Sequence, residues 1–333
     1  MYKVFIDGQA GTTGLRLAQR IDGRPDIGRI EAEEALRKNM TERLSCIAKA
    51  DVTFLCLPDE DAKEIVAAVE ARAAAEGPGS PLAGCRIIDC STAHRTAEGW
   101  TYGMPEITRV DGSMTRIANP GCYATGFILS VRPLVEAGLV DPRTALCLHS
   151  LTGYSGGGRA MIAEYEAPGR LSVGDPLAAP RQYALAQKHK HLPEMQKYAG
   201  LETEPVFAPV VCDFYSGMLV SVPLPSSVLR RSASLAEVRE ILAEYYAGRP
   251  LINVREIGAE FSEASGEGFL SADALSGFDD LELFVTGQEG KIEIVTRYDN
   301  LGKGASGAAI QNMNLLMGLP EDEGLRFGAQ YMC

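Results

Sequence analysis

The 333-residue sequence lacks a long apolar run, has little histidine and carries no excess of basic residues. No apolar stretch reaches the roughly 18 residues that a membrane-spanning helix needs, so we expect no transmembrane helix and no membrane partner. The formal net charge is −12, which argues against a broad surface for nucleic acid or anionic membranes. With 46% hydrophobic and 23% charged residues, the composition is typical of a globular protein of about two domains.

Cysteine is present, but in no arrangement that indicates disulfides or zinc. The sequence has eight Cys without a Cys-x-x-Cys pair and without a signal peptide, which favours reduced thiols and a cytoplasmic location. We see no internal repeat. A metal site is not expected either, because His189 and His191 have no Cys or Asp near them in the sequence.

The segment 117–133 contains the most informative motif, Asn-Pro-Gly-Cys followed by an apolar run. Pro120 fixes φ and Gly121 permits a tight turn, while the apolar run predicts a buried helix. Cys122 then lies in the first turn of that helix, where unpaired N–H groups and the positive end of the helix dipole favour a thiolate. A buried structural Cys is the alternative, and the turn before the helix favours a reactive thiol.

The N-terminal residues predict a dinucleotide-binding loop. A strand over 2–6 is followed by Gly8, Gly11 and Gly14 and then by a helix over 15–21. In this arrangement the backbone approaches a pyrophosphate closely at a helix N-terminus. The spacing is G-x-x-G-x-x-G, so a plain glycine turn is the alternative, but its place directly after the first strand favours the nucleotide.

The end of the second predicted strand, near residue 30, is where this fold contacts the adenosine ribose. Three glutamates within 31–34 favour the ribose hydroxyl of NAD, whereas Arg37 and Lys38 favour the 2′-phosphate of NADP. A solvated charged helix is a third interpretation. The residues by themselves leave all three open.

A polar segment, Ser91-Thr-Ala-His-Arg95, follows the predicted strand 86–90. An earlier apolar run, 52–57, also predicts a parallel strand, with a helix over 59–75 after it. The carboxyl ends of such strands bind ligands, which makes Arg95 a candidate clamp for phosphate or carboxylate, with a surface ion pair as the alternative. We interpret His94 as a loop residue.

Beyond the Cys122 helix the pattern changes to strands with few helices between them, which predicts an antiparallel α+β domain. The predicted strands cover 145–150, 206–213, 218–224, 281–288 and 291–298, and the predicted helices cover 159–166, 234–246 and 304–317. Three consecutive glycines, 156–158, would let the backbone approach a ligand, with a flexible loop as the alternative.

A thiolate nucleophile needs a proton acceptor and donor, and histidine is the usual choice. His189 and His191 are the candidates, and we prefer His191 because Glu194 follows it closely and could orient it. If the segment is extended, the two imidazoles face opposite ways and only one can face Cys122.

Residues 118–126, extended to Arg132-Pro133, resemble the active-site signature of the N-acetyl-γ-glutamyl-phosphate reductases, and residues 7–14 resemble the nucleotide loop of the short form of that family. The similarity covers nearly the whole chain in order. Further similar motifs lie at 91–95, 100–106, 153–159, 189–194, 299–307 and 311–314.

The resemblance implies an NADPH-dependent step of arginine biosynthesis and the architecture of the related aspartate-semialdehyde dehydrogenases. It implies an α/β fold with a Rossmann-like NADP-binding domain, formed by 1–121 and 301–333, and an α+β catalytic and oligomerisation domain, 122–300, with a mostly antiparallel sheet. It also implies a homo-oligomer, either a dimer or a tetramer.

The implied mechanism is attack of Cys122 on the γ-acyl carbon of N-acetyl-γ-glutamyl phosphate, release of phosphate, and hydride transfer to the resulting thioester. His191 would supply and remove protons. The implied substrate contacts are Arg95, Asn119, His189 and Glu194. The implied cofactor contacts are Gly8, Gly11, Thr12, Thr13, Gly14, Arg37, Lys38, Ser91, Gly157, Gly158, Asn300 and Gly304.

One departure from the family pattern concerns the Ser/Thr-Arg pair after the second strand of the longer members, for which Arg37 and Lys38 are our substitutes. Three other functions stay open: a related semialdehyde dehydrogenase acting on aspartate semialdehyde, a non-redox Cys-His hydrolase or acyltransferase, and a nucleotide-sensing regulator. The hydrolase would not need the glycine loop, and the regulator would not need Cys122.

Overall fold

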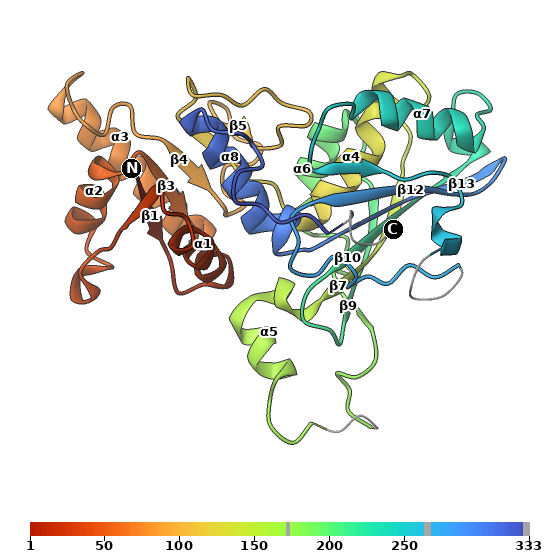
Figure 1. The fold of residues 1–333 in the computed structure, drawn as a ribbon, viewed down its shortest axis with the longest axis horizontal. Helices are drawn as coiled ribbons and strands as arrows, with labels where there is room; N and C mark the ends of the chain where they lie inside the picture. The colour runs from red at the N-terminus through yellow and green to blue at the C-terminus, as the bar shows by residue number, and fades with distance from the viewer. Residues whose placement is uncertain (171–173, 263–267, 329–333) are drawn as a thin grey trace. The chain divides into compact units, whose positions relative to one another are not determined.

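The computed structural model describes residues 1–170, 174–262 and 268–328, and the chain divides into two compact units (Figure 1). The first unit is Met1–Pro120 with Ala305–Gly324, and the second is Gly121–Gly304 with Leu325–Cys333. The predicted domain boundaries keep all of 301–333 with the first domain, whereas the compact units divide that stretch. The functional labels given to the predicted domains stay predictions.

The first unit contains a six-stranded sheet of order β2-β1-β3-β4-β6-β5, and each of its strand pairs is parallel. Its strands are β1 (Tyr2–Asp7), β2 (Ile27–Ile30), β3 (Val52–Leu55), β4 (Ile87–Asp89), β5 (Thr101–Tyr102) and β6 (Arg116–Ala118). Its helices are α1 (Thr12–Asp22), η1 (Glu34–Leu36), α2 (Met40–Lys49), α3 (Asp59–Glu76) and α8 (Gly307–Met317).

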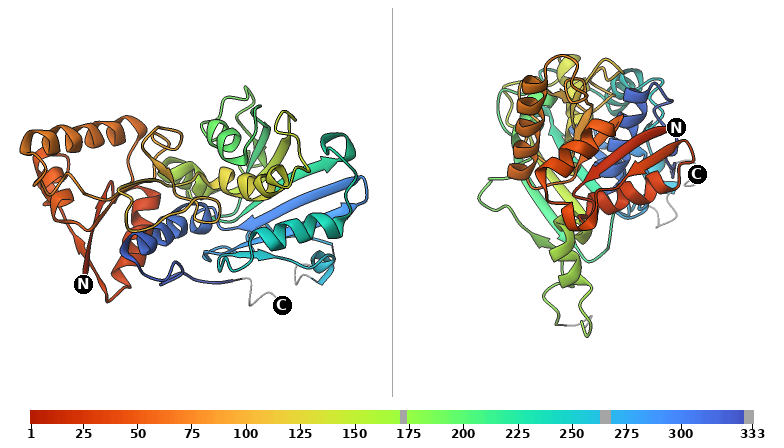
Figure 2. Two further views of the ribbon diagram at one scale, coloured as in Figure 1. Left: turned by 90° about the horizontal axis from the view of Figure 1, so that it is seen from above. Right: turned by 90° about the vertical axis from the view of Figure 1, so that its left-hand side faces the viewer.

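Helices cover both faces of this sheet, as is typical of a parallel sheet. The residues of β3 are all buried, as expected when helices cover both sides of a sheet. Phe5, Leu55 and Ile87 point into one core with α2 and α3, and α1 buries Leu17 and Ile21 elsewhere. Both views of Figure 2 show helices on the two sides of these strands. The order in which strands are added to the sheet reverses between β1 and β3, which is the point where open α/β sheets bind ligands.

The second unit contains a seven-stranded sheet of order β11-β12-β13-β10-β7-β9-β8. Four of its strand pairs are antiparallel, and β11–β12 and β7–β9 are parallel. The predicted fold class, an α/β unit with a parallel Rossmann-like sheet plus an α+β unit with a mostly antiparallel sheet, is therefore confirmed. Its strands are β7 (Cys147–Gly153), β8 (Arg181–Gln182), β9 (Val206–Cys212), β10 (Met218–Pro225), β11 (Ile252–Val254), β12 (Leu281–Gln288) and β13 (Lys291–Tyr298).

One face of this sheet is covered by helices, of which α4 is the central one (Figure 1). The residues Tyr123–Val131 of α4 are buried without a break, because the helix lies between the sheet and its neighbours α6 and α7. The helices of the unit are α4 (Cys122–Glu136), η2 (Tyr154–Gly157), α5 (Gly158–Tyr165), α6 (Leu192–Ala199), η3 (Ser226–Val228), α7 (Leu235–Tyr245) and η4 (Ala259–Ser262). The π-helix η5 (Gly302–Ser306) spans the boundary of the two units.

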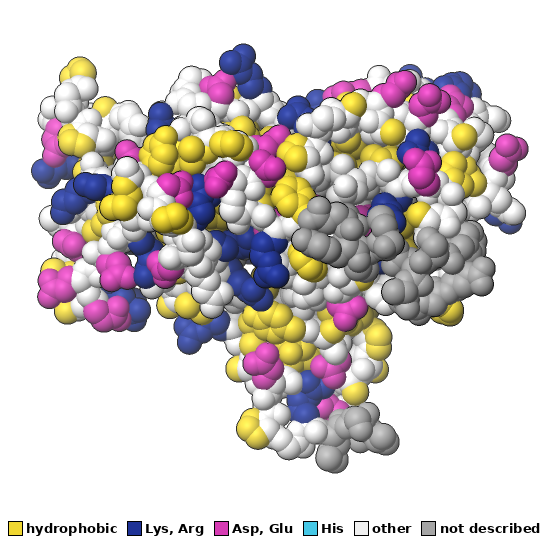
Figure 3. All heavy atoms as spheres, in the orientation of Figure 1, with side chains coloured by type: hydrophobic (Ala, Val, Ile, Leu, Met, Phe, Trp, Pro, Cys, Tyr) yellow, Lys and Arg dark blue, Asp and Glu magenta, His cyan; other side chains and the backbone are white. Residues whose placement is uncertain are grey.

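The α5 segment projects from the β8–β9 edge of the seven-stranded sheet, as Figure 1 and the right-hand view of Figure 2 show. It has a small core of its own, in which Tyr165, Leu177 and Val211 are buried together. Figure 3 shows hydrophobic side chains gathered where this segment meets the sheet. Within the described residues, no helix combines the length and the apolar character needed to cross a membrane.

Candidate active site

The glycine loop connects β1 to α1 at the reversal point of the parallel sheet. Gly8 has a φ of +86°, and a Cβ there would lie 2.3 Å from the carbonyl oxygen of Cys56, which follows β3. A Cβ on Gly14 would lie 2.6 Å from the Gly8 carbonyl oxygen. Both glycines are therefore required by close backbone approaches, whereas a Cβ on Gly11 would meet no atom closer than 3.6 Å.

The start of α1 fits an anionic ligand. Gly11 is the N-cap and supplies no side-chain cap, and Thr12 and Thr13 form the first turn. The Thr12 hydroxyl oxygen is buried and has no hydrogen-bond partner within the described residues. A buried polar atom without a partner is costly, and a helix N-terminus favours phosphate. The loop thus has the features that a dinucleotide pyrophosphate requires.

The charged residues after β2 are exposed, and two of them form ion pairs with arginines of the same region. Arg37 lies 3.3 Å from Glu34, and Arg29 lies 2.8 Å from Glu31. Arg29 also donates a 2.7 Å hydrogen bond to the side chain of Gln9 in the glycine loop. The sequence analysis did not predict this contact between Arg29 and the glycine loop. The only indication in the sequence was an arginine near the end of the second predicted strand. The choice between NADH and NADPH, and the roles of Arg37 and Lys38, stay predictions.

The segment 91–95 is held by the buried carboxylate of Asp89, the last residue of β4. Asp89 accepts hydrogen bonds from the N–H and hydroxyl of Ser91, at 2.9 and 2.8 Å, and lies 2.6 Å from Nδ1 of His94. The imidazole of His94 stacks on Trp100 with a centroid distance of 4.1 Å. Ser91, a predicted cofactor contact, therefore uses its hydroxyl to fix the loop, and His94 is a loop residue.

Arg95 and Asn119 lie together in the first unit. Nε of Arg95 donates to the carbonyl oxygen of Asn119 at 2.9 Å, and both side chains are buried. The Asn119 side-chain amide donates to the carbonyl of Ala305 at 3.0 Å and accepts from Asn312 at 3.4 Å. The side chain of Asn119 thus serves internal contacts, whereas Arg95 remains the candidate for binding phosphate.

In the second unit, Cys122 is the first residue of α4, as predicted for its segment. The N-cap is Gly121, which provides no side-chain cap and donates its N–H to Oε2 of Glu194 at 3.1 Å. The carbonyl of Cys122 accepts a 2.6 Å hydrogen bond from the hydroxyl of Tyr298. Cys122 is a half-buried thiol at a helix start without a side-chain cap, which is the environment of a reactive cysteine.

His189 and His191 both lie beside Tyr123, the residue after Cys122. Each imidazole centroid is 5.9 Å from the Tyr123 ring, and the two imidazoles are 4.7 Å apart. We expected opposite directions for an extended segment, but His191 has helical backbone angles (φ −86°, ψ −13°) as the N-cap of α6. The condition for that expectation is not met, because a turn and not a strand connects the two residues.

Glu194 links the histidine segment to the start of α4. One carboxylate oxygen accepts from Gly121 N–H, and the other lies 4.0 Å from Nε2 of His191, beyond hydrogen-bond distance. The side chain is 1% exposed. This position favours an orienting role for Glu194 over the predicted contact with substrate.

The residues predicted to flank a cofactor differ in what a side chain at each glycine would meet and in the contacts they make. A Cβ on Gly304 would lie 2.9 Å from Cβ of Cys122, so this residue allows the chain to pass the candidate nucleophile. A Cβ on Gly157 would meet the Met161 side chain, while Gly158 has a φ of +73° with open space around it. Asn300 accepts from Gly217 N–H and donates to Ser155 Oγ, so its amide organises the loop after β7.

Two tyrosines near Cys122 were missed by sequence reasoning. Tyr183 donates a 2.7 Å hydrogen bond to the hydroxyl of Tyr123, and the Tyr183 ring also lies 6.1 Å from His189. Burial raises the pKa values of both hydroxyls above their usual range. Tyr123 adjoins the Cys, which was the one available signal, whereas Tyr183 has no motif that singles it out. No group of three or more metal-ligating side chains occurs among the described residues.

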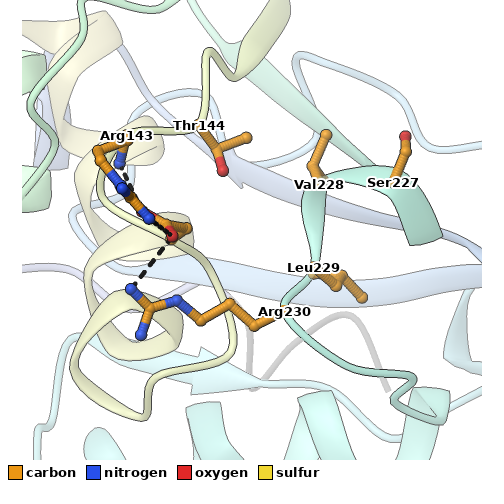
Figure 4. A pocket seen from close by; sticks show the side chains of 7 residues that line it. Arg143, Thr144, Ser227, Val228, Leu229 and Arg230 are labelled. Carbon is orange, nitrogen blue, oxygen red and sulfur yellow. Dashed lines mark hydrogen bonds and ion pairs between the residues drawn. The ribbon is translucent and has the colours of Figure 1, made fainter.

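A surface pocket of about 430 Å³ in the second unit is separate from Cys122. Arg143 and Arg230 both form ion pairs with the carboxylate of Asp141, at 2.8 and 3.2 Å. Figure 4 shows the side chains of the two arginines in this pocket. Asp141 and Arg143 follow the C-terminal end of α4, whose 15 residues put that end about 20 Å from Cys122, whereas Arg230 follows η3. The pocket is lined by Asp141, Arg143, Thr144, Ser227, Val228, Leu229 and Arg230.

Comparison with known proteins identifies the family. Residues 122–300 match the family model described as semialdehyde dehydrogenase, dimerisation domain. An N-acetyl-γ-glutamyl-phosphate reductase of a Nostoc species is 40% identical over 97% of this chain and 99% of its own length. The Brucella suis protein of that name is 42% identical over 95% of this chain and 99% of its own. The chain belongs to the N-acetyl-γ-glutamyl-phosphate reductase family.

Solved structures support the fold of this reductase family member. An aspartate semialdehyde dehydrogenase from Francisella tularensis superimposes with a TM-score of 0.67 at 14% identity, over 95% of this chain and all of that one. The enzyme from Candida albicans, solved with NADP, gives a TM-score of 0.60 at 15% identity, over 96% and 99% of the two chains. At these identities the likeness concerns the fold alone. The resemblance that the sequence motifs indicated is confirmed.

Proposed function

We propose that the protein catalyses the NADPH-dependent reductive dephosphorylation of N-acetyl-γ-glutamyl phosphate to N-acetylglutamate semialdehyde, a step of arginine biosynthesis. The observation that carries the proposal is Cys122 at the uncapped start of α4, beside two histidines that contact Tyr123. A nucleophile, a proton acceptor and an orienting carboxylate thus occur in one unit. Membership of a reductase family supports the same chemistry.

In the first step the Cys122 thiolate attacks the γ-acyl carbon and forms a carbon–sulfur bond. The bond to the phosphate oxygen breaks, and phosphate leaves with the electron pair and takes up a proton from water. His191 accepts the thiol proton beforehand and returns it to the sulfur when the aldehyde departs. Backbone N–H groups in the first turn of α4 are suited to stabilise negative charge on the acyl oxygen. Covalent catalysis divides one difficult reduction into two easier steps.

The tautomer of His189 supports different roles for the two histidines. Nδ1 of His189 accepts a hydrogen bond from the backbone N–H of His191 at 3.2 Å. The proton of the neutral ring then lies on Nε2, which makes His189 a hydrogen-bond donor. A donor is suited to binding a carboxylate or carbonyl of the substrate. We therefore assign proton transfer to His191 and substrate binding to His189.

The glycine loop of the first unit is the proposed nucleotide site. The close backbone approaches at Gly8 and Gly14 and the buried hydroxyl of Thr12 fit a pyrophosphate at the start of α1. When bound, NADPH supplies the hydride that reduces the thioester carbon. Arg37 and Lys38 are the proposed contacts of its 2′-phosphate. We propose that Gly157, Gly158 and the 300–304 segment shape the space for the nicotinamide.

Arg95 is the proposed clamp for the substrate phosphate. A buried guanidinium held by the Asn119 carbonyl is a fixed cation, and its binding of phosphate is charge-assisted. Arg95→Ala should raise the KM for phosphate in the reverse reaction by about tenfold or more, as loss of such a contact generally does. An unchanged phosphate KM would leave Arg95 with a structural role only.

We further propose that the protein is a cytoplasmic homo-oligomer, assembled through the sheet face opposite α4. On that face, β7 exposes Cys147 and His149, and the neighbouring Val206 of β9 is 54% exposed. A second copy related by two-fold symmetry would cover these side chains. Val206→Glu should lower the mass measured by light scattering, and Leu36→Glu, at an exposed residue of the first unit, should not. Equal masses for both variants would exclude this face.

The test of the activity is a coupled assay in the reverse direction. N-acetylglutamate semialdehyde should reduce NADP only when inorganic phosphate is present, and aspartate semialdehyde should react far more slowly. A preference for aspartate semialdehyde would make the protein a related dehydrogenase. Turnover of the acyl phosphate without any oxidation of NADPH would make it a hydrolase.

A further inference from the structure

Tyr298 contacts both ends of the first turn of α4, the helix that begins with Cys122. Its hydroxyl donates to the carbonyl oxygen of Cys122 at 2.6 Å and accepts from the N–H of Gly126 at 3.1 Å. These two backbone groups are four residues apart and are the pair that an α-helix joins directly. One fully buried hydroxyl therefore interacts with both groups that close the turn behind the candidate nucleophile.

The position of this hydroxyl is fixed by the centre of the sheet. Tyr298 is the last residue of β13, and it pairs with Met218 of β10 on one side and with Leu281 of β12 on the other. Its approach to α4 depends on the missing side chain at Gly126, where a Cβ would lie 2.7 Å from the Tyr298 hydroxyl oxygen. The sheet and the helix thus meet at one hydrogen-bonded point, directly behind Cys122.

We propose that Tyr298 is a positioning residue for the nucleophile, which sets the orientation of the first turn of α4 and thereby the direction of the Cys122 thiol. The proposal rests on the proposed role of Cys122. A short hydrogen bond to the Cys122 carbonyl fixes the peptide group between Cys122 and Tyr123, and with it the backbone from which the thiol side chain extends. Misplacement of a reacting group by about 1 Å costs on the order of 100-fold in rate, so this plane matters for catalysis.

The hydroxyl is suited to act as a donor at neutral pH. Burial, with the negative charge of a nearby Cys122 thiolate as a further cause, raises the pKa of Tyr298 well above its usual value. The hydroxyl keeps its proton at neutral pH and stays a donor to the Cys122 carbonyl. Loss of the hydroxyl in Tyr298→Phe leaves the ring in place and lets Gly126 N–H and the Cys122 carbonyl pair only with each other.

A matched control contacts the same helix from the end of α7. The hydroxyl of Tyr246 donates a 2.7 Å hydrogen bond to the carbonyl oxygen of Leu129, and it is buried as well. Tyr246→Phe removes the same kind of hydrogen bond from α4, seven residues beyond Cys122 in the sequence. The two variants therefore differ mainly in how close the lost hydroxyl lies to the nucleophile.

The experiment compares kcat, KM, melting temperature and thiol reactivity for the two variants. Tyr298→Phe should lower kcat by about tenfold or more with KM changed less than about threefold, whereas Tyr246→Phe should keep kcat within about twofold. Without substrate or cofactor, the alkylation rate of Cys122 by iodoacetamide, read from its peptide by mass spectrometry, should change in Tyr298→Phe only. The alkylation rate of Cys122 in Tyr246→Phe is the reference for this comparison.

Equal kcat values for the two variants, or a Tyr298→Phe enzyme with wild-type kcat and alkylation rate, would overturn the proposal. A lower melting temperature with unchanged kcat would reduce Tyr298 to a structural residue. If Tyr298→Phe does not fold, Gly126→Ala should reproduce the loss of kcat, because its Cβ would lie 2.4 Å from the hydroxyl oxygen of Thr296 and 2.7 Å from that of Tyr298, so that both must move. A wild-type kcat in Gly126→Ala would overturn the proposal. Full activity of Cys122→Ser would instead refute the proposed function. The alkylation test does not depend on the proposed function, because it measures only the reactivity of the Cys122 thiol.

Discussion

The backbone N–H of His191 donates a hydrogen bond to Nδ1 of His189, with 3.2 Å between the two nitrogens. A ring nitrogen that accepts cannot carry the proton, so the proton of neutral His189 lies on Nε2. The same turn that makes His191 the N-cap of α6 thus fixes the tautomer of its neighbour. The two histidines are chemically distinct although they are two residues apart and contact the same tyrosine.

This distinction predicts different kinetic effects of the two substitutions. His191→Asn should lower kcat by about two to four orders of magnitude, the usual contribution of a general acid–base group. His189→Asn, which keeps a side-chain donor, should mainly raise the substrate KM. Steady-state kinetics of both variants check this. A larger loss of kcat in His189→Asn would exchange the two roles.

The paired hydroxyls of Tyr123 and Tyr183 predict a feature of the pH dependence. Burial raises the pKa values of both groups, and a raised pKa means that the neutral hydroxyl persists to higher pH. Neither tyrosine then loses its proton below about pH 10, the ordinary tyrosine value. In Tyr183→Phe the alkaline limb of the kcat/KM profile should therefore stay where it is in the wild type. If the alkaline decrease in kcat/KM disappears in Tyr183→Phe, the group that titrates there belongs to the tyrosine pair.

The elements that the sequence predicted are those with local signals. The β1–glycine loop–α1 unit follows from an apolar run, fixed glycine spacing and helical periodicity. Helices α2 and α6 were not predicted, and the short strands β5, β6, β8 and β11 give no periodic pattern. The C-terminal helix was predicted over 304–317, but α8 begins at Gly307 because Gly302–Ser306 form a π-helix.

In the candidate site, too, the features that adjoin each other in the sequence could be predicted, and the contacts between distant residues could not. Cys122 at a helix start could be predicted, since the turn and the apolar run adjoin it in the sequence. Tyr298 and Gly304 reach Cys122 from more than 170 residues away, and only the folded sheet brings them there. The opposite faces expected for His189 and His191 assumed an extended segment, and the turn into α6 changes that geometry.

The cofactor preference can be tested at the end of β2. Arg37 is exposed and paired with Glu34, and surface pairs of this kind are worth about 1 kcal/mol or less, so Arg37 can exchange its partner for a 2′-phosphate at little cost. We expect a lower Kd for NADPH than for NADH, and Arg37→Ala with Lys38→Ala should weaken NADPH binding more than NADH binding. Titration calorimetry measures both values. An equal loss for the two cofactors would place the 2′-phosphate elsewhere.

Cys122 should form a covalent acyl-enzyme before any hydride is transferred. Its place at the uncapped start of α4 favours the thiolate, and attack on the acyl phosphate needs no cofactor. Enzyme mixed with N-acetyl-γ-glutamyl phosphate in the absence of NADPH should release a burst of about one phosphate per active site, as accumulation of an acyl-enzyme does. Mass spectrometry should locate the acyl group on the Cys122 peptide. Cys122→Ser should show no burst and should still bind NADPH, because the glycine loop is unchanged. Phosphate release that requires NADPH, without any adduct, would mean that hydride attacks the acyl phosphate directly and that Cys122 is not the nucleophile.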